Sequence, residues 1–178
     1  NPDNARSSFQ TAVEVNPDFF DGFIALGLAY AADMDTLAFG FFETAKELRP
    51  RSVEAQYNLA YCLQEFKPTN LRFLDRARQE YQSILQIDSS NAAAAFNQGY
   101  IHLEYLQLYD SAAHYFSRAI DVLPYYHQAF YNRGLSYESL DNIRQAELDY
   151  REALRIKPDY TDAARALERA IQTLENVR

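Results

Sequence analysis

One pattern of residues recurs along the chain at intervals of 33 to 39 residues. Its clearest copy reads Phe130-x2-Arg133-Gly134-x2-Tyr137, then Ala146-x3-Tyr150, then Pro158. The last position of successive copies is held by Pro17, Pro50, Ser89, Pro124 and Pro158, at intervals of 33, 39, 35 and 34 residues. A period in this range is typical of solenoids, in which each repeat contacts only its neighbours. The search for function is therefore directed to an extended surface and away from an enclosed pocket.

The other copies keep this frame to different degrees. The first full copy reads Phe23-x2-Leu26-Gly27-x2-Tyr30, Ala38-x3-Phe42, Pro50. A degenerate second copy reads Gln56-x2-Leu59-Ala60-x2-Leu63, Ala77-x3-Tyr81, Ser89. The third reads Ala95-x2-Gln98-Gly99-x2-His102, Ala112-x3-Phe116, Pro124, and a half copy, Ala5-x3-Phe9 and Pro17, opens the chain.

Each copy predicts two helices joined by a short turn, because apolar and small residues recur three and four positions apart. Proline ends the second helix, since it cannot continue a helix and restricts the residue before it. The predicted helices span residues 3–15, 20–31, 35–48, 53–66, 72–87, 92–106, 109–122, 127–140, 143–156 and 161–176. We therefore expect an all-α fold, a single solenoid of paired antiparallel helices over residues 1–178.

The segments of this solenoid follow from the repeat boundaries. They are the second helix of a truncated repeat (1–19), four repeats (20–52, 53–91, 92–126 and 127–160) and a polar capping helix (161–178). The second repeat is longer because the turn around Pro68 adds about five residues, which we count from the repeat frame. We interpret this insertion either as tolerated at one edge or as a loop that contacts a partner.

Three glycines stand in the middle of predicted first helices, at Gly27, Gly99 and Gly134. Glycine in a helix interior costs about 1 kcal/mol relative to alanine, so we expect each to mark a close approach of the two helices of a repeat. The expected small partners on the second helices are Ala38, Ala77, Ala112 and Ala146. Four second-helix aromatic residues are expected to pack into the following repeat: Phe42, Tyr81, Phe116 and Tyr150.

The net charge and the composition of the chain argue against some classes of partner. A net charge of −8 argues against nucleic acid, whose affinity comes largely from Lys and Arg on phosphates, and against an anionic membrane surface. No run of about 18 apolar residues occurs, so we expect no membrane insertion by this segment. Cys62 is the only cysteine, which excludes an internal disulfide. We expect it to be a small core residue.

The residues give no indication of catalysis or of a cofactor. No zinc-protease, paired-cysteine, phosphate-loop or serine–histidine–aspartate arrangement occurs. His102 and His114 lie on the paired helices of one repeat, but a metal site needs further ligands. We therefore expect neither an enzyme nor a cofactor or metal.

The repeated frame is similar to that of tetratricopeptide repeats, W-x2-L-G-x2-Y…A-x3-F…P, over essentially the whole chain. It departs from that frame because tryptophan is absent, Ala60 and Leu63 replace Gly and Tyr, and Ser89 replaces Pro. The resemblance implies a right-handed superhelix in which the first helix of each repeat lines an inner groove that binds a protein or peptide. The groove positions it implies for binding are Glu54, Tyr57, Asn58, Tyr61, Phe96, Asn97, Tyr100, Gln128, Tyr131 and Asn132.

Asparagine holds one equivalent groove position in three consecutive repeats, at Asn58, Asn97 and Asn132. Its amide is both donor and acceptor, so a ladder of such amides can pair with the main chain of an extended peptide. The alternative is that the amides bond to neighbouring helices and hold the repeats together. The flanking aromatic residues either contact the ligand or pack between first helices.

The resemblance does not extend to the family's carboxylate clamp for acidic chaperone tails. The clamp's two Lys positions and its Arg position hold Ile24, Ala93 and Asn97 in one alignment, and Tyr57, Gln128 and Asn132 in another. We therefore expect no binding of acidic chaperone tails. The expected function is a non-enzymatic adaptor for an extended segment of another protein.

Two alternatives remain open. The first is a scaffold that self-associates through its ends or outer face, as a homo-oligomer. The second is a regulatory module of a larger protein, since the chain opens halfway through a repeat. The residues favour neither the cytoplasm nor a bacterial envelope.

Overall fold

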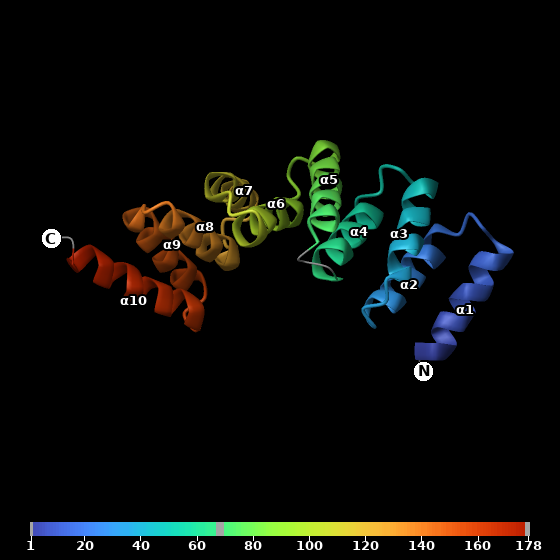
Figure 1. The fold of residues 1–178 in the computed structure, drawn as a ribbon. Helices are drawn as coiled ribbons and strands as arrows, with labels where there is room; N and C mark the ends of the chain where they lie inside the picture. Colours follow the sequence, from blue (N-terminus) through green and yellow to red (C-terminus); the bar gives the residue numbers. More distant parts are fainter. Residues whose placement is uncertain (1, 67–69, 177–178) are drawn as a thin grey trace. The chain divides into compact units, whose positions relative to one another are not determined.

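The computed structural model describes residues 2–66 and 70–176, and within these ranges every regular element is a helix (Figure 1). In chain order they are α1 (Pro2–Val15), α2 (Phe20–Ala31), α3 (Leu37–Leu48), α4 (Val53–Phe66), α5 (Leu71–Ile87), α6 (Ala92–Tyr100), the π-helix η1 (Ile101–Tyr105), α7 (Tyr109–Val122), α8 (His127–Ser139), α9 (Ile143–Ile156) and α10 (Thr161–Asn176). The all-α prediction with paired helices is confirmed.

The helices form two compact units, Asn1–Ser89 and Ser90–Arg178. In the first unit, each of α1 to α4 packs against the next helix, and the first helices α2 and α4 also contact each other. In the second unit, α6 to α10 pack in the same sequential way. The finer division into repeat segments is an interpretation of the sequence.

The prolines that end the repeats occupy one kind of turn. Pro17, Pro50, Pro124 and Pro158 are each the second residue of a four-residue turn closed by a hydrogen bond from the fourth N–H to the first C=O, at 2.9 to 3.1 Å. Proline fits this position because its fixed φ matches that of the turn. The tight turn brings the next first helix back against the helix just completed.

The third repeat contains a structural departure that the sequence analysis missed, because residues 92–106 were predicted as one regular helix. The helix changes to π geometry at Ile101–Tyr105, where the Leu106 N–H donates to Ile101 O over 3.2 Å. In the first and fourth repeats, a backbone hydrogen bond closes the turn after the first helix. It runs from Asp35 N to Tyr30 O in the first repeat and from Asn142 N to Tyr137 O in the fourth. A π turn accommodates one more residue than an α turn.

The hydrogen bond that closes the corresponding turn of the third repeat spans one residue more than in the first and fourth repeats. There Leu108 N donates to His102 O, one residue further back than in the other two repeats. The residue before each donor lies at positive φ, namely Met34 (55°), Gln107 (54°) and Asp141 (58°). The π-helix therefore absorbs the one-residue insertion that makes this interval 35 residues long instead of 34.

The mid-helix glycines do mark close contacts, but their neighbours differ from those predicted. A Cβ placed on Gly99 or Gly134 would lie 2.8 Å or 2.5 Å from the ring of Phe116 or Tyr150, and one on Gly27 would overlap the Phe42 ring. The nearest group is therefore the second-helix aromatic ring and not the predicted alanine. The ring lies flat on the space where a side chain is missing.

The four second-helix rings are fully buried, and two of them reach the next repeat, as predicted. Phe116 packs with Leu135 of α8, and Tyr150 packs with Ala166 and Ala170 of α10. Each of these two rings therefore joins the two helices of its own repeat to the helix that follows.

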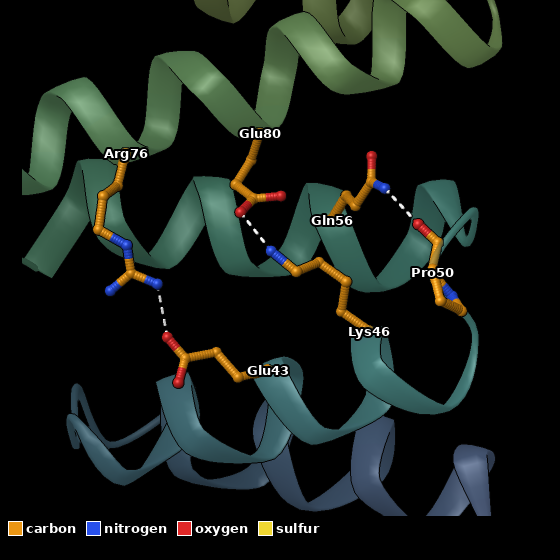
Figure 2. A network of polar contacts seen from close by, with 6 residues as sticks. All are labelled: Glu43, Lys46, Pro50, Gln56, Arg76 and Glu80. Atoms are coloured by element: carbon orange, nitrogen blue, oxygen red, sulfur yellow. Dashed lines mark hydrogen bonds and ion pairs between the residues drawn. The ribbon is translucent and has the colours of Figure 1, made fainter.

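Polar contacts connect α3, α4 and α5 in the first unit (Figure 2). Lys46 of α3 pairs with Glu80 of α5 at 2.5 Å, and Arg76 of α5 pairs with Glu43 of α3 at the same distance. Gln56 of α4 stands where the first and fourth repeats have Phe23 and Phe130, and its Nε2 donates to Pro50 O over 2.8 Å. A hydrogen bond to the inter-repeat turn thus takes the place of aromatic packing.

The predicted insertion around Pro68 lies outside the described residues. Its flanks are the end of α4 at Phe66 and the start of α5 at Leu71. The Phe39 ring of α3 lies 5.4 Å from the Phe66 ring and 5.6 Å from the Phe73 ring. This aromatic contact holds the two flanks against α3.

The glycine–ring contact predicts opposite effects of two glycine-to-alanine changes. Gly134→Ala should destabilise the chain by about 2 kcal/mol, because the new methyl group forces the buried Tyr150 ring to move. Gly40→Ala, in the exposed part of α3 with no described atom within 4 Å, should stabilise it by up to about 1 kcal/mol. Urea unfolding of both variants measures the two shifts. Equal effects of the two changes would contradict this packing account.

Candidate functional site

The first-helix surface of the first unit is formed by α2 and α4. Glu54 and Tyr61 of α4 are exposed, Tyr57 and Asn58 are half-buried, and Leu28 of α2 is exposed. The helices place these residues together because α2 and α4 are in contact. The surface therefore combines apolar, aromatic and acidic side chains.

Aromatic pairs one helical turn apart lie on the first helices of both units. The Tyr57 and Tyr61 rings stack on α4 with centroids 6.3 Å apart, and the Phe96 and Tyr100 rings stack on α6 with centroids 6.5 Å apart. Each pair sits beside a predicted asparagine, Asn58 or Asn97. Stacked rings give a rigid surface at little cost in side-chain entropy.

The second-helix tyrosine of the second repeat lies directly behind this pair. The Tyr81 ring meets the Tyr57 ring edge-on at 5.8 Å, and Tyr81 is fully buried. Neither its hydroxyl nor the Oε1 atom of buried Gln64 has a hydrogen-bond partner among the described residues. Burial raises the pKa of Tyr81 well above its usual range, and the nearby Tyr57 and Glu65 raise it further.

In the second unit the predicted asparagines are mostly buried. Asn97 and Asn132 are 7% and 8% exposed. The amide Nδ2 of Asn132 donates to Gln128 O, one turn back in its own helix, over 2.8 Å. The Gln128 side chain itself is exposed at the start of α8.

The three predicted asparagines are divided between the units, since Asn58 lies in the first and the other two in the second. The ladder across three repeats therefore stays a prediction. The alternative, in which the amides bond to neighbouring helices, also stays open. The bond of Asn132 described above is to its own helix and is compatible with both interpretations.

A polar cluster surrounds Glu138 of α8 in the second unit. Its carboxylate accepts hydrogen bonds from Arg169 Nε and Nη2 of α10, both at 2.9 Å, and from the Tyr150 hydroxyl at 2.5 Å. Burial alone would raise the pKa of Glu138, but the hydrogen bonds from Arg169 and Tyr150 outweigh it and lower the pKa. The Tyr131 ring lies 5.9 Å from Tyr150 on the same cluster.

A buried ion pair was missed by the sequence analysis. Arg133 of α8 donates from Nε and Nη2 to both carboxylate oxygens of Asp149 in α9, at 2.8 and 2.7 Å, and from Nη1 to Ser117 of α7 at 3.0 Å. A planar guanidinium suits this two-pronged contact. The signal was Arg133 itself, which stands where two other repeats have Leu26 and Leu59.

The histidines and the cysteine show no assembled chemical site. No group of three metal-ligating side chains occurs in the described part of the chain. The His102 Nδ1 lies 2.7 Å from Gln98 O, and the rings of His102 and His114 both contact Tyr115. Cys62 is buried, and burial followed by the charge of Glu65 raises its pKa to about 11. Its thiol is therefore protonated at neutral pH.

These features define the class of protein: a helical-repeat protein whose first helices present apolar, aromatic and acidic side chains. A sequence model of the tetratricopeptide repeat family matches residues 127–160. The fourth repeat of the chain therefore matches a tetratricopeptide repeat. A comparison with curated protein sequences found no match. No described helix is long and apolar enough to cross a membrane.

Solved structures share the fold at low sequence identity. The MamA protein is 19% identical, with a TM-score of 0.78 over 90% of this chain and 85% of that one. YrrB, described as a TPR protein with an unusual peptide-binding site, is 22% identical, with a TM-score of 0.78 over 94% and 84%. PilF of Pseudomonas aeruginosa is 24% identical, with a TM-score of 0.72 over 98% and 71%.

The cluster around Glu138 predicts a pH-dependent contribution to stability. Because its folded-state pKa is lowered, the contribution is present above the ordinary pKa of about 4.5 and is lost as the pH falls through the folded value. Glu138→Gln should therefore cost about 1 kcal/mol at pH 7 and less at pH 3. Urea unfolding at both pH values measures this, with Glu175→Gln on the exposed face of α10 as control. A loss that is equal at both pH values would contradict the assignment.

Proposed function

We propose that the chain is a non-enzymatic interaction module that binds an extended segment of another protein along its first helices. The observation that carries the proposal is the repeated motif of a stacked aromatic pair beside an asparagine, at Tyr57–Asn58–Tyr61 on α4 and Phe96–Asn97–Tyr100 on α6. Tetratricopeptide repeats are in general a non-catalytic interaction fold, and YrrB offers a structural precedent for peptide binding on this fold.

The chemistry of the motif fits a main-chain ligand. An extended peptide presents N–H and C=O groups that a side-chain amide can pair with, whatever the peptide sequence. Tyrosine and phenylalanine beside the amide supply contact area for the peptide side chains. The half-buried Asn58 keeps its side chain partly accessible on α4. We place Glu54 and Gln128, both exposed, at the rim of this surface.

The proposal predicts that the asparagines contribute jointly to binding. Substituting Asn58, Asn97 and Asn132 by alanine should weaken binding of 12-residue peptides, selected on the intact chain from an unbiased display library. At about 1 kcal/mol for each amide, the expected loss of affinity is about 100-fold. Calorimetric titration measures the affinity, and circular dichroism checks that the helices persist.

The matched control removes amides from the second helices, by Gln79→Ala with Gln145→Ala, both of which are exposed. The control should bind the selected peptides like the unaltered chain. Unchanged affinity in the folded asparagine variant would refute the proposed binding surface.

A second candidate is assembly through the face of α10. Leu154 of α9 with Ala164, Leu167 and Ile171 of α10 lines an apolar hollow of about 380 Å³ in the second unit. Light scattering tests this candidate: a monomer at high concentration counts against it, whereas a concentration-dependent oligomer that Ile171→Glu dissociates supports it.

A further inference from the structure

An arginine completes the polar cluster of the fourth repeat. The Glu138 carboxylate accepts from Arg169 at 2.9 Å and from the Tyr150 hydroxyl at 2.5 Å, and the Tyr131 ring lies 5.9 Å from Tyr150. The arginine comes from α10, the next first helix along the chain. Every strong polar group of this cluster therefore has a partner.

The second repeat has the same arrangement of rings but lacks the arginine. Tyr57 and Tyr81 are the equivalents of Tyr131 and Tyr150 in the repeat frame, and their rings are 5.8 Å apart. Gln64 stands in place of Glu138, and the carboxylate is moved to the next position, Glu65. The Tyr81 hydroxyl and Gln64 Oε1 are both buried without a hydrogen-bond partner in the described chain. Leaving such atoms unsatisfied costs about 1–3 kcal/mol each.

The charge next to these buried atoms also has no ion-pair partner among the described residues. Glu65 is exposed, accepts a hydrogen bond from Gln64 Nε2 at 3.2 Å, and forms no ion pair with any described residue. Tyr61, one turn before it, is 47% exposed and stacks on Tyr57. Because Tyr61 and Glu65 are four positions apart on α4, the phenol and the carboxylate lie on the same helix face. Burial and then the charge of Glu65 raise the pKa of Tyr61.

Elsewhere in the first unit, the same combination of ring and carboxylate is occupied by one of the chain's own arginines. Arg6 lies 4.7 Å above the Tyr30 ring and pairs with Asp33 at 2.5 Å. Arg49 lies 4.0 Å above the Phe20 ring, and its Nη1 is 3.9 Å from Asp21. On α4, Tyr61 and Glu65 present the ring and the carboxylate without the arginine.

We propose that Tyr61 and Glu65 form a subsite for an arginine side chain of the bound segment. A guanidinium stacks on an aromatic face while its edge donates to a carboxylate. Lysine fits less well, because its ammonium is a point charge that does not stack. The net charge of −8 favours the approach of such a basic segment. This inference rests on the proposed function, since it assigns the partner's side chain at one position.

The test compares two blocked pentapeptides, one with arginine between alanines and the other with citrulline in its place. Citrulline keeps the shape of arginine but has no charge. Both peptides are titrated into the isotope-labelled 178-residue chain, and amide shifts are followed by NMR. The arginine peptide should bind about tenfold more tightly than the citrulline peptide, with saturable shifts centred on Tyr61 and Glu65 of α4.

Two variants with the same net charge separate the subsite from the general field of the protein. Glu65→Gln should reduce the preference for arginine to less than about threefold. Glu14→Gln, on the exposed face of α1, should leave it unchanged. Equal loss in both variants, equal binding of the two peptides, or no shifts on α4 with about 5 mM arginine peptide would each overturn the subsite.

The failures of the two proposals are distinguishable. If library-selected peptides bind through the asparagines but show no preference for arginine, the subsite falls and the proposed function stands. If the selected peptides bind the asparagine variant as tightly as the unaltered chain, the proposed function is refuted. The pentapeptide titration then still decides whether α4 recognises a guanidinium.

Discussion

The contact between a first-helix glycine and the aromatic ring of the second helix determines how each repeat is built. The rings of Phe42, Phe116 and Tyr150 occupy the space beside Gly27, Gly99 and Gly134, and all three rings are fully buried. Because Phe116 and Tyr150 also reach the following helix, one side chain sets the distance within a repeat and the packing to the next. The faces of the first helices that lie outside this core are free to carry function.

The way each repeat departs from the common frame has a definite physical consequence. In the second repeat, Gln56 makes a hydrogen bond to Pro50 O where the first and fourth repeats have a phenylalanine ring. In the third repeat, the π-helix accommodates one extra residue. On the first helices, Glu138 is neutralised by Arg169, whereas Glu65 on α4 has no cationic partner in the described chain. The repeats thus share a core but differ in the charge that they offer to a partner.

The periodic part of the structure could be predicted from the sequence, because small, aromatic and proline positions recur with the helix pairs that they build. What the sequence could not predict were effects that depend on geometry at one site. The sequence predicted a continuous helix through the π-helix because Gly99, Leu103 and Leu106 recur four and three positions apart. The neighbours of the glycines and the Arg133–Asp149 pair depend on side-chain directions, which spacing alone does not specify.

The central claim is that the first helices carry the binding surface. It is tested most directly by mapping amide chemical shifts, with a library-selected peptide bound to the isotope-labelled chain. The account predicts that the largest changes fall on α4, α6 and α8, around Asn58, Asn97 and Asn132. Changes confined to the second helices α3, α5, α7 and α9, or to the apolar hollow between α9 and α10, would contradict it.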